Sequence, residues 1–441
     1  MIENVSPLIL ELQDRASAGR PVTVGLVGAG QMGIDLLIQL RRMPGIRLGG
    51  VAVRNVPIAI ETLAWCGYDA ARIIEANTSA AIDTALEKDQ FPVTSDIAAL
   101  AGAGHINVLI DATGNPNTGA TVALTAIEQG KHVVMLNVEA DITIGRYLID
   151  AARSAGVIYT GAAGDEPAAT LELIGFAQSI GLEIVCAGKG KNNALDFNAV
   201  PKDFEKEARE RNMNARVLVE FVDGSKTMVE MVAIANCTGL VPDVPGMHGP
   251  SAGRDELADV LIPKEDGGIL SKSGCVDYSI GKGVAPGVFC IVKADHPRVT
   301  ERIADLKVGK GPYFSLLRPF HLTSLEVPLT AARAVLHRRA DMLQLARPVA
   351  EAVSVAKRDL AVGETLGKIG ETQYRAFAMT YDDARSGNAM PLGLAEHGKV
   401  IRPIKAGEIL SYDNCAPDES LLVTQIRRRL DERDAVRLAA Q

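Results

Sequence analysis

The stretch PVTVGLVGAGQMG, residues 21–33, carries the strongest structural signal in the chain. An apolar run ends in a turn of the pattern G-x-G-x-x-G, and the helix-like run IDLLIQLRRM follows at 34–43. In such a turn the first glycine permits the tight bend, the second lets the backbone approach a pyrophosphate, and the third lets helix and strand pack closely. The free N–H groups at the start of the helix favour phosphate. We therefore predict that this loop binds a dinucleotide, through Gly28, Ala29, Gly30, Gln31, Met32 and Gly33.

The next apolar run indicates which dinucleotide is bound. IRLGGVAVR, residues 46–54, reads as a second strand that ends at Arg54. Arg54 lies roughly twenty residues beyond Gly33, where an acidic residue would bind the ribose hydroxyls of NAD and an arginine suits the 2′-phosphate of NADP. The alternative is an exposed charge at a strand end. We expect NADPH as the cofactor.

Strand-like and helix-like segments continue to alternate after this point. INVLIDATGNP (106–116) and KHVVMLNVEAD (131–141) read as buried strands, and GATVALTAIEQG (119–130) between them reads as a helix. This pattern is typical of a parallel sheet covered on both faces, whose ligands lie at the carboxyl ends of the strands. We expect four residues at those ends to lie beside the nicotinamide: Thr113, Gly114, Asn137 and Glu139.

One more strand and then a helix follow in GVIYTGAAGDEPAATLELIGFAQSIG (156–181), and the pattern changes from about residue 182. The acidic pair Asp165-Glu166 before Pro167 is typical of a helix cap. LEIVCAGKG (182–190), ARVLVEFVDG (215–224) and TMVEMVAIANCTG (227–239) are strand-like or amphipathic. They predict a smaller mixed α/β domain.

Within this domain, the segment CAGKGKNNALDF, residues 186–197, contains several polar side chains directly after the end of an apolar strand. Lys189 and Lys191 are two apart and could share a strand face. A lysine there could stabilise an alkoxide developing on a carbonyl, and Asp196 could orient a lysine or relay a proton. Asn192 and Asn193 are candidate substrate ligands. The alternative is a solvated loop whose lysines face water.

Further candidates lie later in this unit. Glu230, in KTMVEM, is either catalytic or paired with Lys226 one helical turn away. Together with Asp196 it could hold a divalent cation through oxygen ligands. In GPYFSLLRPFHLTSLEVPL (311–329), Arg318 and His321 could bind a phosphate, although a lone histidine in an apolar stretch is often a core residue. Lys282, on a glycine-flanked loop, is a weaker phosphate candidate.

Composition excludes several classes of protein. The chain has 441 residues, more than one hydrophobic core usually fills, with a formal charge of −8. The negative charge argues against binding to nucleic acid or to an anionic membrane surface. The N-terminus lacks the basic and apolar regions of a signal peptide, and the six cysteines form no CxxC pair. We expect a cytoplasmic protein with reduced, mostly buried thiols.

The C-terminal part reads differently. Short strands with frequent turn signals begin near 350 and predict a small β-rich domain, and the final stretch predicts an exposed helix with charges of both signs. The expected domains are 1–165 (Rossmann, NADP-binding), 166–349 (α+β, substrate and dimerisation), 350–425 (β-rich) and 426–441 (helix).

These motifs together resemble known families. AKRDLAVGETL and GLAEHGKVIRPIKAGEIL resemble SAF (β-clip) domains, and the first two domains resemble the homoserine dehydrogenase superfamily. The whole chain, with its G-K-G-K-N-N, G-D-E-P and R-P-F-H-L segments, resembles the DXR-like oxidoreductases. That family is a second type of 1-deoxy-D-xylulose 5-phosphate reductoisomerase.

The resemblance implies an activity and a set of roles. It implies NADPH-dependent formation of 2-C-methyl-D-erythritol 4-phosphate for isoprenoid synthesis, in a homodimer or higher homo-oligomer. By similarity to homoserine dehydrogenases, Lys189 or Lys191 with Asp196 take the roles of the lysine and aspartate of that superfamily. Whether the reaction also requires a divalent cation, Mg²⁺ or Mn²⁺, stays open. The alternatives are an NADP oxidoreductase that acts on a polyol or sugar acid without rearrangement, and a non-catalytic NADP-sensing regulator.

Overall fold

The computed structural model describes residues 6–211 and 213–439. The chain forms two compact units. Unit 1 comprises Met1–Asp165, Leu322–Leu343 and Ile426–Gln441, and unit 2 comprises Glu166–His321 and Gln344–Gln425. The four domains expected from the sequence stay a prediction.

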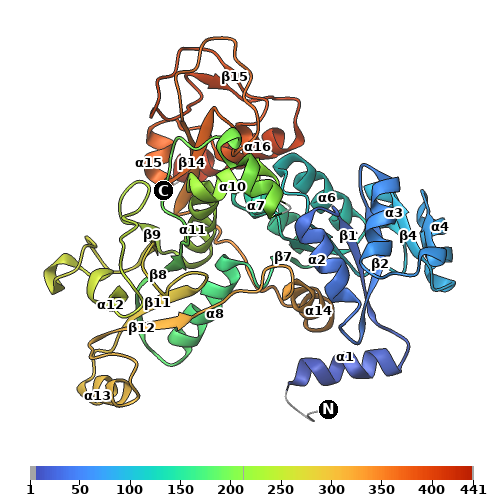
Figure 1. Cartoon of the computed structure of the whole chain (residues 1–441), viewed down its shortest axis with the longest axis horizontal. Helices are drawn as coiled ribbons and strands as arrows, with labels where there is room; N and C mark the ends of the chain where they lie inside the picture. The colour runs from blue at the N-terminus through green and yellow to red at the C-terminus, as the bar shows by residue number, and fades with distance from the viewer. Residues whose placement is uncertain (1–5, 212, 440–441) are drawn as a thin grey trace. The chain divides into compact units, whose positions relative to one another are not determined.

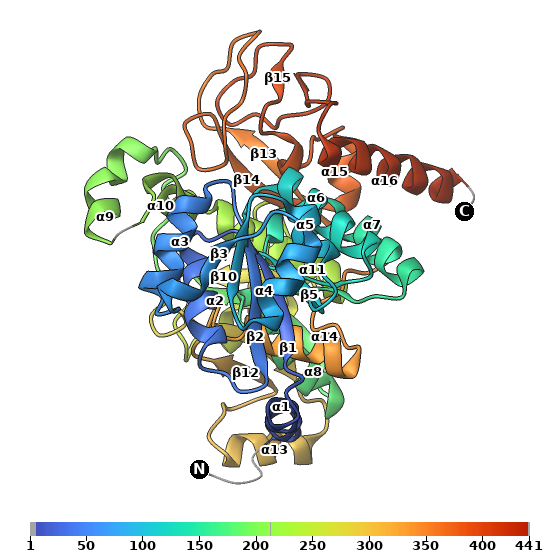
Figure 2. The ribbon, with the colours of Figure 1, turned by 90° about the vertical axis from the view of Figure 1, so that its right-hand side faces the viewer.

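Unit 1 is built on a seven-stranded sheet in the order β3-β4-β2-β1-β5-β6-β7, and all its strand pairs are parallel. Figure 2 shows β1 and β2 side by side in this sheet, next to α5. The strands are β1 (Val22–Val27), β2 (Ile46–Ala52), β3 (Ile73–Glu75), β4 (Phe91–Thr94), β5 (Val108–Asp111), β6 (His132–Met135) and β7 (Tyr159–Gly161). From β1 the chain builds one side of the sheet through β2 and then the other side through β5. The strand order therefore reverses between β1 and β5, which is where open α/β sheets bind ligands.

The helices of unit 1 are α1 (Pro7–Ser17), α2 (Gln31–Leu40), α3 (Val56–Trp65), α4 (Ser79–Glu87), α5 (Ile97–Gly102), α6 (Pro116–Glu128), α7 (Val138–Ala155) and α14 (Val327–His337), with the 3-10 turn η1 (Ala70–Arg72). Many of them begin at a side chain that accepts an N–H of the first turn: Asn55, Thr78, Asp96, Asn115 and Asn137. β1 is buried along its whole length, as expected for a strand covered on both faces. The predicted α/β fold with a Rossmann-like domain is confirmed.

One predicted strand is shorter than expected. KHVVMLNVEAD was expected to be strand throughout, but β6 ends at Met135 and α7 begins at Val138. The cause is local, because the Asn137 side chain accepts a hydrogen bond from the N–H of Ala140 at 3.1 Å and so starts a helix. Glu139 therefore lies in the first turn of α7.

Unit 2 contains a five-stranded mixed sheet in the order β12-β11-β8-β10-β9. Figure 1 shows β8, β11 and β12 side by side, with α8 next to them. The strands are β8 (Glu183–Gly190), β9 (Val241–Pro242), β10 (Cys275–Ser279), β11 (Val288–Lys293) and β12 (Tyr313–Arg318). β11 runs antiparallel to β8 and to β12, and β10 runs parallel to β8. The carboxyl ends of β8, β10 and β12 consequently meet at one edge of the sheet.

The helices of unit 2 are α8 (Glu166–Ser179), α9 (Glu205–Glu210), α10 (Ala215–Val222), α11 (Ser225–Thr238), α12 (Leu257–Val260), α13 (Pro297–Asp305) and α15 (Tyr381–Ser386), with η2 (Pro201–Phe204), η3 (Lys264–Asp266) and η4 (Leu392–Leu394). The segments at 215–224 and 227–239, which looked strand-like or amphipathic, form α10 and α11. An apolar run of this length does not distinguish a strand from a buried helix, and α11 is buried on almost every side.

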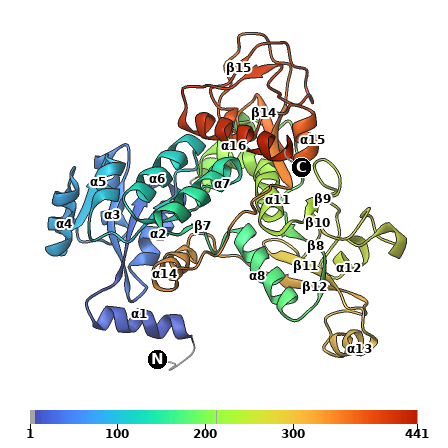
Figure 3. The same ribbon diagram turned by 180° about the vertical axis from the view of Figure 1, so that it is seen from behind.

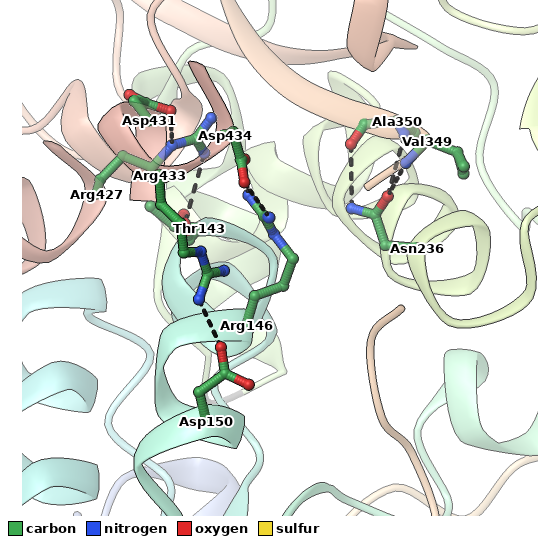
Figure 4. Close-up of polar contacts among 10 residues, drawn as sticks. All are labelled: Thr143, Arg146, Asp150, Asn236, Val349, Ala350, Arg427, Asp431, Arg433 and Asp434. Atoms are coloured by element: carbon green, nitrogen blue, oxygen red, sulfur yellow. Dashed lines mark hydrogen bonds and ion pairs between the residues drawn. The ribbon is translucent and has the colours of Figure 1, made fainter. Parts of the chain in front are cut away.

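The C-terminal part of unit 2 adds two small antiparallel sheets: β13 (Ala350–Ala356) with β14 (Tyr374–Thr380), and β15 (Lys399–Val400) with β16 (Cys415–Ala416). Asn236 of α11 fixes the start of β13. Its amide accepts from the N–H groups of Val349 and Ala350, at 2.9 and 3.0 Å, and donates to the carbonyl of Ala350 at 3.0 Å (Figure 4). The similarity of this part to SAF domains stays a prediction.

The last helix, α16 (Leu422–Ala439), is not the exposed helix that its charges predicted. It lies beside α7 (Figure 3), where Arg146 of α7 and Asp434 form a buried bidentate ion pair with distances of 3.0 and 2.6 Å. Arg427 is also buried, and it donates to the carbonyl of Thr143 at 3.5 Å (Figure 4). The helix therefore uses part of its charge to pack against α7, which a pattern of alternating charge does not reveal.

All six cysteines are free thiols, and Cys237 is the one that is not fully buried. Within the described residues, the helices are too short or too polar to cross a membrane. The cytoplasmic location stays a prediction.

The ion pair between Arg146 and Asp434 predicts the effect of a substitution in α16. Asp434→Ala would remove the carboxylate that forms the buried bidentate ion pair with Arg146, so we expect the free energy of unfolding to fall by about 3 kcal/mol. Glu432→Ala, at an exposed position of the same helix, is the control and should change it little. Urea unfolding followed by far-UV circular dichroism measures both. Equal unfolding midpoints for the two variants would contradict the assignment.

Candidate active site

The glycine-rich loop of unit 1 has the geometry that a bound pyrophosphate requires. Gly28 has a φ of +96°, and a Cβ there would lie 2.9 Å from the carbonyl oxygen of Ala112. A Cβ on Gly33 would lie 2.3 Å from the carbonyl oxygen of Gly28. A Cβ on Gly30 would meet nothing within 4 Å. Two of the glycines are thus fixed by packing, and the third leaves open space at the start of α2.

The start of α2 fits a phosphate ligand. Gly30 is the N-cap of α2 and provides no side-chain hydrogen bond to the first turn. Gln31 and Met32 are exposed and Ala29 is half-buried. The backbone N–H groups of this turn can therefore bind an anion. Arg54 lies exposed two residues beyond the end of β2, the strand that pairs with β1.

The residues predicted to flank the nicotinamide divide into two kinds. Gly114 is exposed and Thr113 is partly so, whereas Asn137 and Glu139 are buried. The amide of Asn137 donates to Oδ2 of Asp111 at 3.2 Å, and the N–H of Thr113 donates to Oδ1 of Asp111 at 3.0 Å. Burial raises the pKa of Asp111 to about 6 despite these hydrogen bonds. Asn137 therefore ties the ends of β5 and β6 together, and Gly114 is the more accessible member of the set.

In unit 2, four ionisable side chains gather where β8 ends. Nζ of Lys189 donates to Oε1 of Glu166 at 2.5 Å and also to Oε2 of Glu230. Nε2 of His321 lies 3.4 Å from the same Oε1 of Glu166. Glu166 begins α8, Glu230 lies in α11 and His321 follows β12. We call Lys189, Glu166, Glu230 and His321 the Lys189 cluster.

Strand register explains how β8 and β12 contribute to the same place. Lys189 and Arg318 are both partners of Val288 in β11, so they lie in one row across the sheet. Side chains in one row project from the same face, and α8 packs on that face. Arg318 donates to Oε2 of Glu172 in α8 at 2.8 Å and stacks on Phe320. Arg318 and His321 are thus both held by carboxylates of α8.

Glu166 is the member of the cluster that the sequence did not identify as functional. Its place before Pro167 indicated a helix cap, and it is indeed the first residue of α8. The Lys189 ammonium reaches it from a strand 23 residues later in the chain. The available signal in the sequence was the acidic GDEP segment, which precedes the strand that carries Lys189. No local pattern indicated that Glu166 and Lys189 would meet.

The cluster changes the acidity of its members. Burial alone would lower the pKa of Lys189, but the charges of Glu166 and Glu230 outweigh it and hold that pKa above the ordinary value. Burial and the neighbouring charge of Glu166 raise the pKa of Glu230 to about 7, although the Lys189 ammonium opposes the shift. Lys189 is therefore a permanent cation near neutral pH, whereas Glu230 can exchange a proton there.

Lys191 has the opposite environment from Lys189. Its side chain is buried and donates to the carbonyl of Phe221. Burial and the positive charge of Lys189 together lower the pKa of Lys191 to about 8. The two lysines predicted to act together therefore carry different partners and different protonation behaviour.

The remaining predicted residues of this unit lie outside the cluster. Asn192, Asn193 and Asp196 are exposed. The Asp196 carboxylate accepts the N–H of Asn198 at 3.0 Å, and so forms a local turn and does not orient a lysine. Lys282 is exposed as well. The chain leaves β8 in a loop after Gly190, which is why Asn192, Asn193 and Asp196 lie in solvent, whereas Lys282 lies on the separate loop between β10 and β11.

Two segments of the chain match known families. Residues 28–160 match the family described as "Homoserine dehydrogenase, NAD binding domain", and residues 164–327 match "Oxidoreductase DRL, catalytic domain". These matches support an oxidoreductase in which residues 28–160 resemble a nicotinamide-binding domain of the homoserine dehydrogenase type and residues 164–327 resemble a catalytic domain of the DRL type. The Lys189 cluster lies wholly within the second matched segment. A search of curated proteins finds no match.

Solved structures resemble the chain only distantly. A homoserine dehydrogenase from Thiobacillus denitrificans is 16% identical, with a TM-score of 0.41 over 88% of this chain and 98% of that one. A probable dehydrogenase from Thermotoga maritima is 15% identical, with a TM-score of 0.36 over 61% and 72%. A DOX-P reductoisomerase in complex with magnesium is 15% identical, with a TM-score of 0.32 over 48% and 56%. Likenesses this low identify no substrate for this chain.

The environment of Lys191 predicts its titration. In protein labelled with ¹³C at lysine Cε, we expect one resonance to titrate with a midpoint of about 8 and to be missing from the Lys191→Arg variant. Between about pH 8 and pH 10.5, the latter being the ordinary pKa of lysine, the Lys191 amine binds its proton more tightly in the unfolded chain than in the folded one. Lys191 therefore destabilises the fold below pH 8, and the penalty disappears as the pH rises through this range. A midpoint for Lys191 near that of a free lysine would refute the assignment.

Proposed function

We propose that this chain catalyses the NADPH-dependent conversion of 1-deoxy-D-xylulose 5-phosphate to 2-C-methyl-D-erythritol 4-phosphate, a step toward isoprenoid precursors. The observation that carries the proposal is the Lys189 cluster, a buried cation held between two carboxylates inside the segment that matches the DRL catalytic domain. The two matched segments supply the two requirements of such a reaction, a nicotinamide-binding domain and proton-transfer groups.

The reaction needs a rearrangement and a reduction. In the rearrangement one carbon–carbon bond of the keto-sugar breaks and another forms, which gives a branched aldehyde. In the reduction a hydride adds to the aldehyde carbon and a proton adds to its oxygen. NADPH would supply the hydride, bound at the loop Gly28–Gly33 with its 2′-phosphate at Arg54.

The residues of unit 2 suit the proton and charge transfers. The Lys189 ammonium would donate a hydrogen bond to the oxygen that becomes an alkoxide, and this bond strengthens as negative charge develops. Glu230, with a pKa near 7, would take the proton from a substrate hydroxyl and return it to the product. Lys191, with a pKa near 8, is a second group that can exchange a proton.

Arg318 is the proposed ligand of the substrate phosphate. Its present partner, Glu172, is half exposed, so a phosphate dianion could replace that carboxylate at little cost in buried charge. Arginine binds phosphate through two parallel hydrogen bonds. His321, three residues further on, would donate a hydrogen bond beside it.

A reduction or oxidation without rearrangement is the second candidate. The match of residues 28–160 to a homoserine dehydrogenase domain favours it, with a polyol or a sugar acid as substrate. The carbon connectivity of the product separates the two reactions, because only the reductoisomerase changes it. A non-catalytic NADP-sensing regulator would not need the buried ion pairs of the cluster. The expected homodimer stays a prediction.

Purified protein tests the proposal directly. NADPH consumption is followed with 1-deoxy-D-xylulose 5-phosphate, with and without Mn²⁺, and ¹³C NMR identifies the product. We expect turnover to the branched polyol phosphate. Lack of turnover under both conditions would overturn the proposal, and turnover of a polyol or sugar acid with an unchanged carbon skeleton would establish the second candidate.

The role of Lys189 predicts a large loss of activity on substitution. Lys189→Met keeps most of the length of the side chain and removes the charge, so we expect kcat to fall about 10²-fold or more. Lys202→Met, at an exposed position of unit 2, is the matched control and should retain full activity. Steady-state kinetics of both folded variants measure the effect, and similar rates for the two would exclude Lys189 from the chemistry.

The role of Arg54 predicts a change in cofactor preference. In Arg54→Ala we expect KM for NADPH to rise about tenfold, the equivalent of one charge-assisted hydrogen bond, with KM for NADH unchanged. Arg42→Ala, an exposed arginine at the other end of α2, is the control. An unchanged KM for NADPH in Arg54→Ala would remove the argument for NADPH over NADH.

A further inference from the structure

Glu166 and Glu230 have the arrangement of a divalent-cation site. Each offers a carboxylate oxygen, and the two oxygens lie within 4.8 Å of each other. Both residues are buried, and Asp165 directly precedes Glu166 in the chain. Buried carboxylates this close repel one another unless a positive charge lies between them. The question is which positive charge this chain uses.

The Lys189 ammonium already occupies the position between the two carboxylates. Its Nζ lies 2.5 Å from Oε1 of Glu166 and donates to Oε2 of Glu230 as well. Ca²⁺ or Mg²⁺ would have to lie about 2.0 to 2.6 Å from the same oxygens. An ion there would overlap the ammonium, and an ion beside it would face a like charge in a poorly solvated place. The donor set does not fit a divalent cation while Lys189 holds its position.

The ammonium is also firmly held. Lys189 is the second-last residue of β8, and β8 is paired with β10 on one side and β11 on the other. A metal ion could therefore not displace it by a small movement of an exposed loop, because the backbone of Lys189 is fixed by strand pairing.

We infer that Lys189 takes the place of a divalent metal ion between Glu166 and Glu230, so that this chain binds no metal at this carboxylate pair. The inference concerns the site of the proposed function, but metal binding can be measured without any substrate. Lys189 supplies one positive charge and hydrogen bonds of fixed direction, where a metal would supply two charges and a Lewis acid.

Mn²⁺ titration followed by electron paramagnetic resonance tests the inference on the full chain. For the wild type we expect no Mn²⁺ ion to bind at Glu230, so the wild type and Glu230→Gln should bind the same number of Mn²⁺ ions per chain. For Lys189→Met we expect one new Mn²⁺ equivalent, bound at least tenfold more tightly than any equivalent of the wild type. The double variant Lys189→Met with Glu230→Gln is the matched control and should lose it again.

Two outcomes would overturn the inference. One is a wild-type Mn²⁺ equivalent that disappears in Glu230→Gln. The other is a folded Lys189→Met variant, with unchanged NADPH binding, that gains no Mn²⁺ equivalent; Lys189→Ala repeats this test if the methionine variant does not fold. If the proposed activity is found, it should also survive treatment with a chelator within twofold. If no activity is found, the binding titrations still decide the inference.

Discussion

The candidate site depends on one buried ion group, the Lys189 ammonium between Glu166 and Glu230. Each partner comes from a different element, β8, α8 and α11, and none of the three charges is tolerable in this place without the others. The pairing therefore holds a strand and two helices in register at the same time as it places a cation at the strand end. This is why the same interaction serves the packing of unit 2 and the chemistry proposed for it.

Two lysines two residues apart take opposite roles because their surroundings differ. Lys189 contacts two carboxylates, which favour its charged form. Lys191 is buried, donates to a carbonyl and lies near the charge of Lys189, and its burial and that charge favour its neutral form. One amine stays a cation and the other can lose its proton near neutral pH. A pair of like groups whose environments separate their pKa values is the arrangement that acid–base chemistry at neutral pH requires.

In unit 1 the corresponding constraint is steric. Side chains at Gly28 and Gly33 would collide with backbone carbonyl oxygens, while Gly30 faces open space. Packing thus fixes two glycines of the motif, and the third is explained by close approach of a ligand. One pair of charges in unit 1 serves structure: Arg146 and Asp434 are buried against each other where α16 meets α7. Charge alone does not distinguish a functional group from a structural one, and burial with its partners does.

The sequence by itself determined the Rossmann-like sheet and the dinucleotide loop, because these follow from local apolar periodicity. It also made three residues candidates: Lys189 from its place at a strand end, Glu230 from its position in a helix-like segment, and His321 from its place among aromatic residues and prolines. Only the tertiary structure decided that Glu166 completes the cluster and that Asp196 does not, since strand register and helix packing join residues far apart in the chain. The same reason explains α10, α11 and the buried face of α16, whose local patterns fit more than one structure. Local patterns specify elements, whereas the partners of a buried charge are specified by long-range packing.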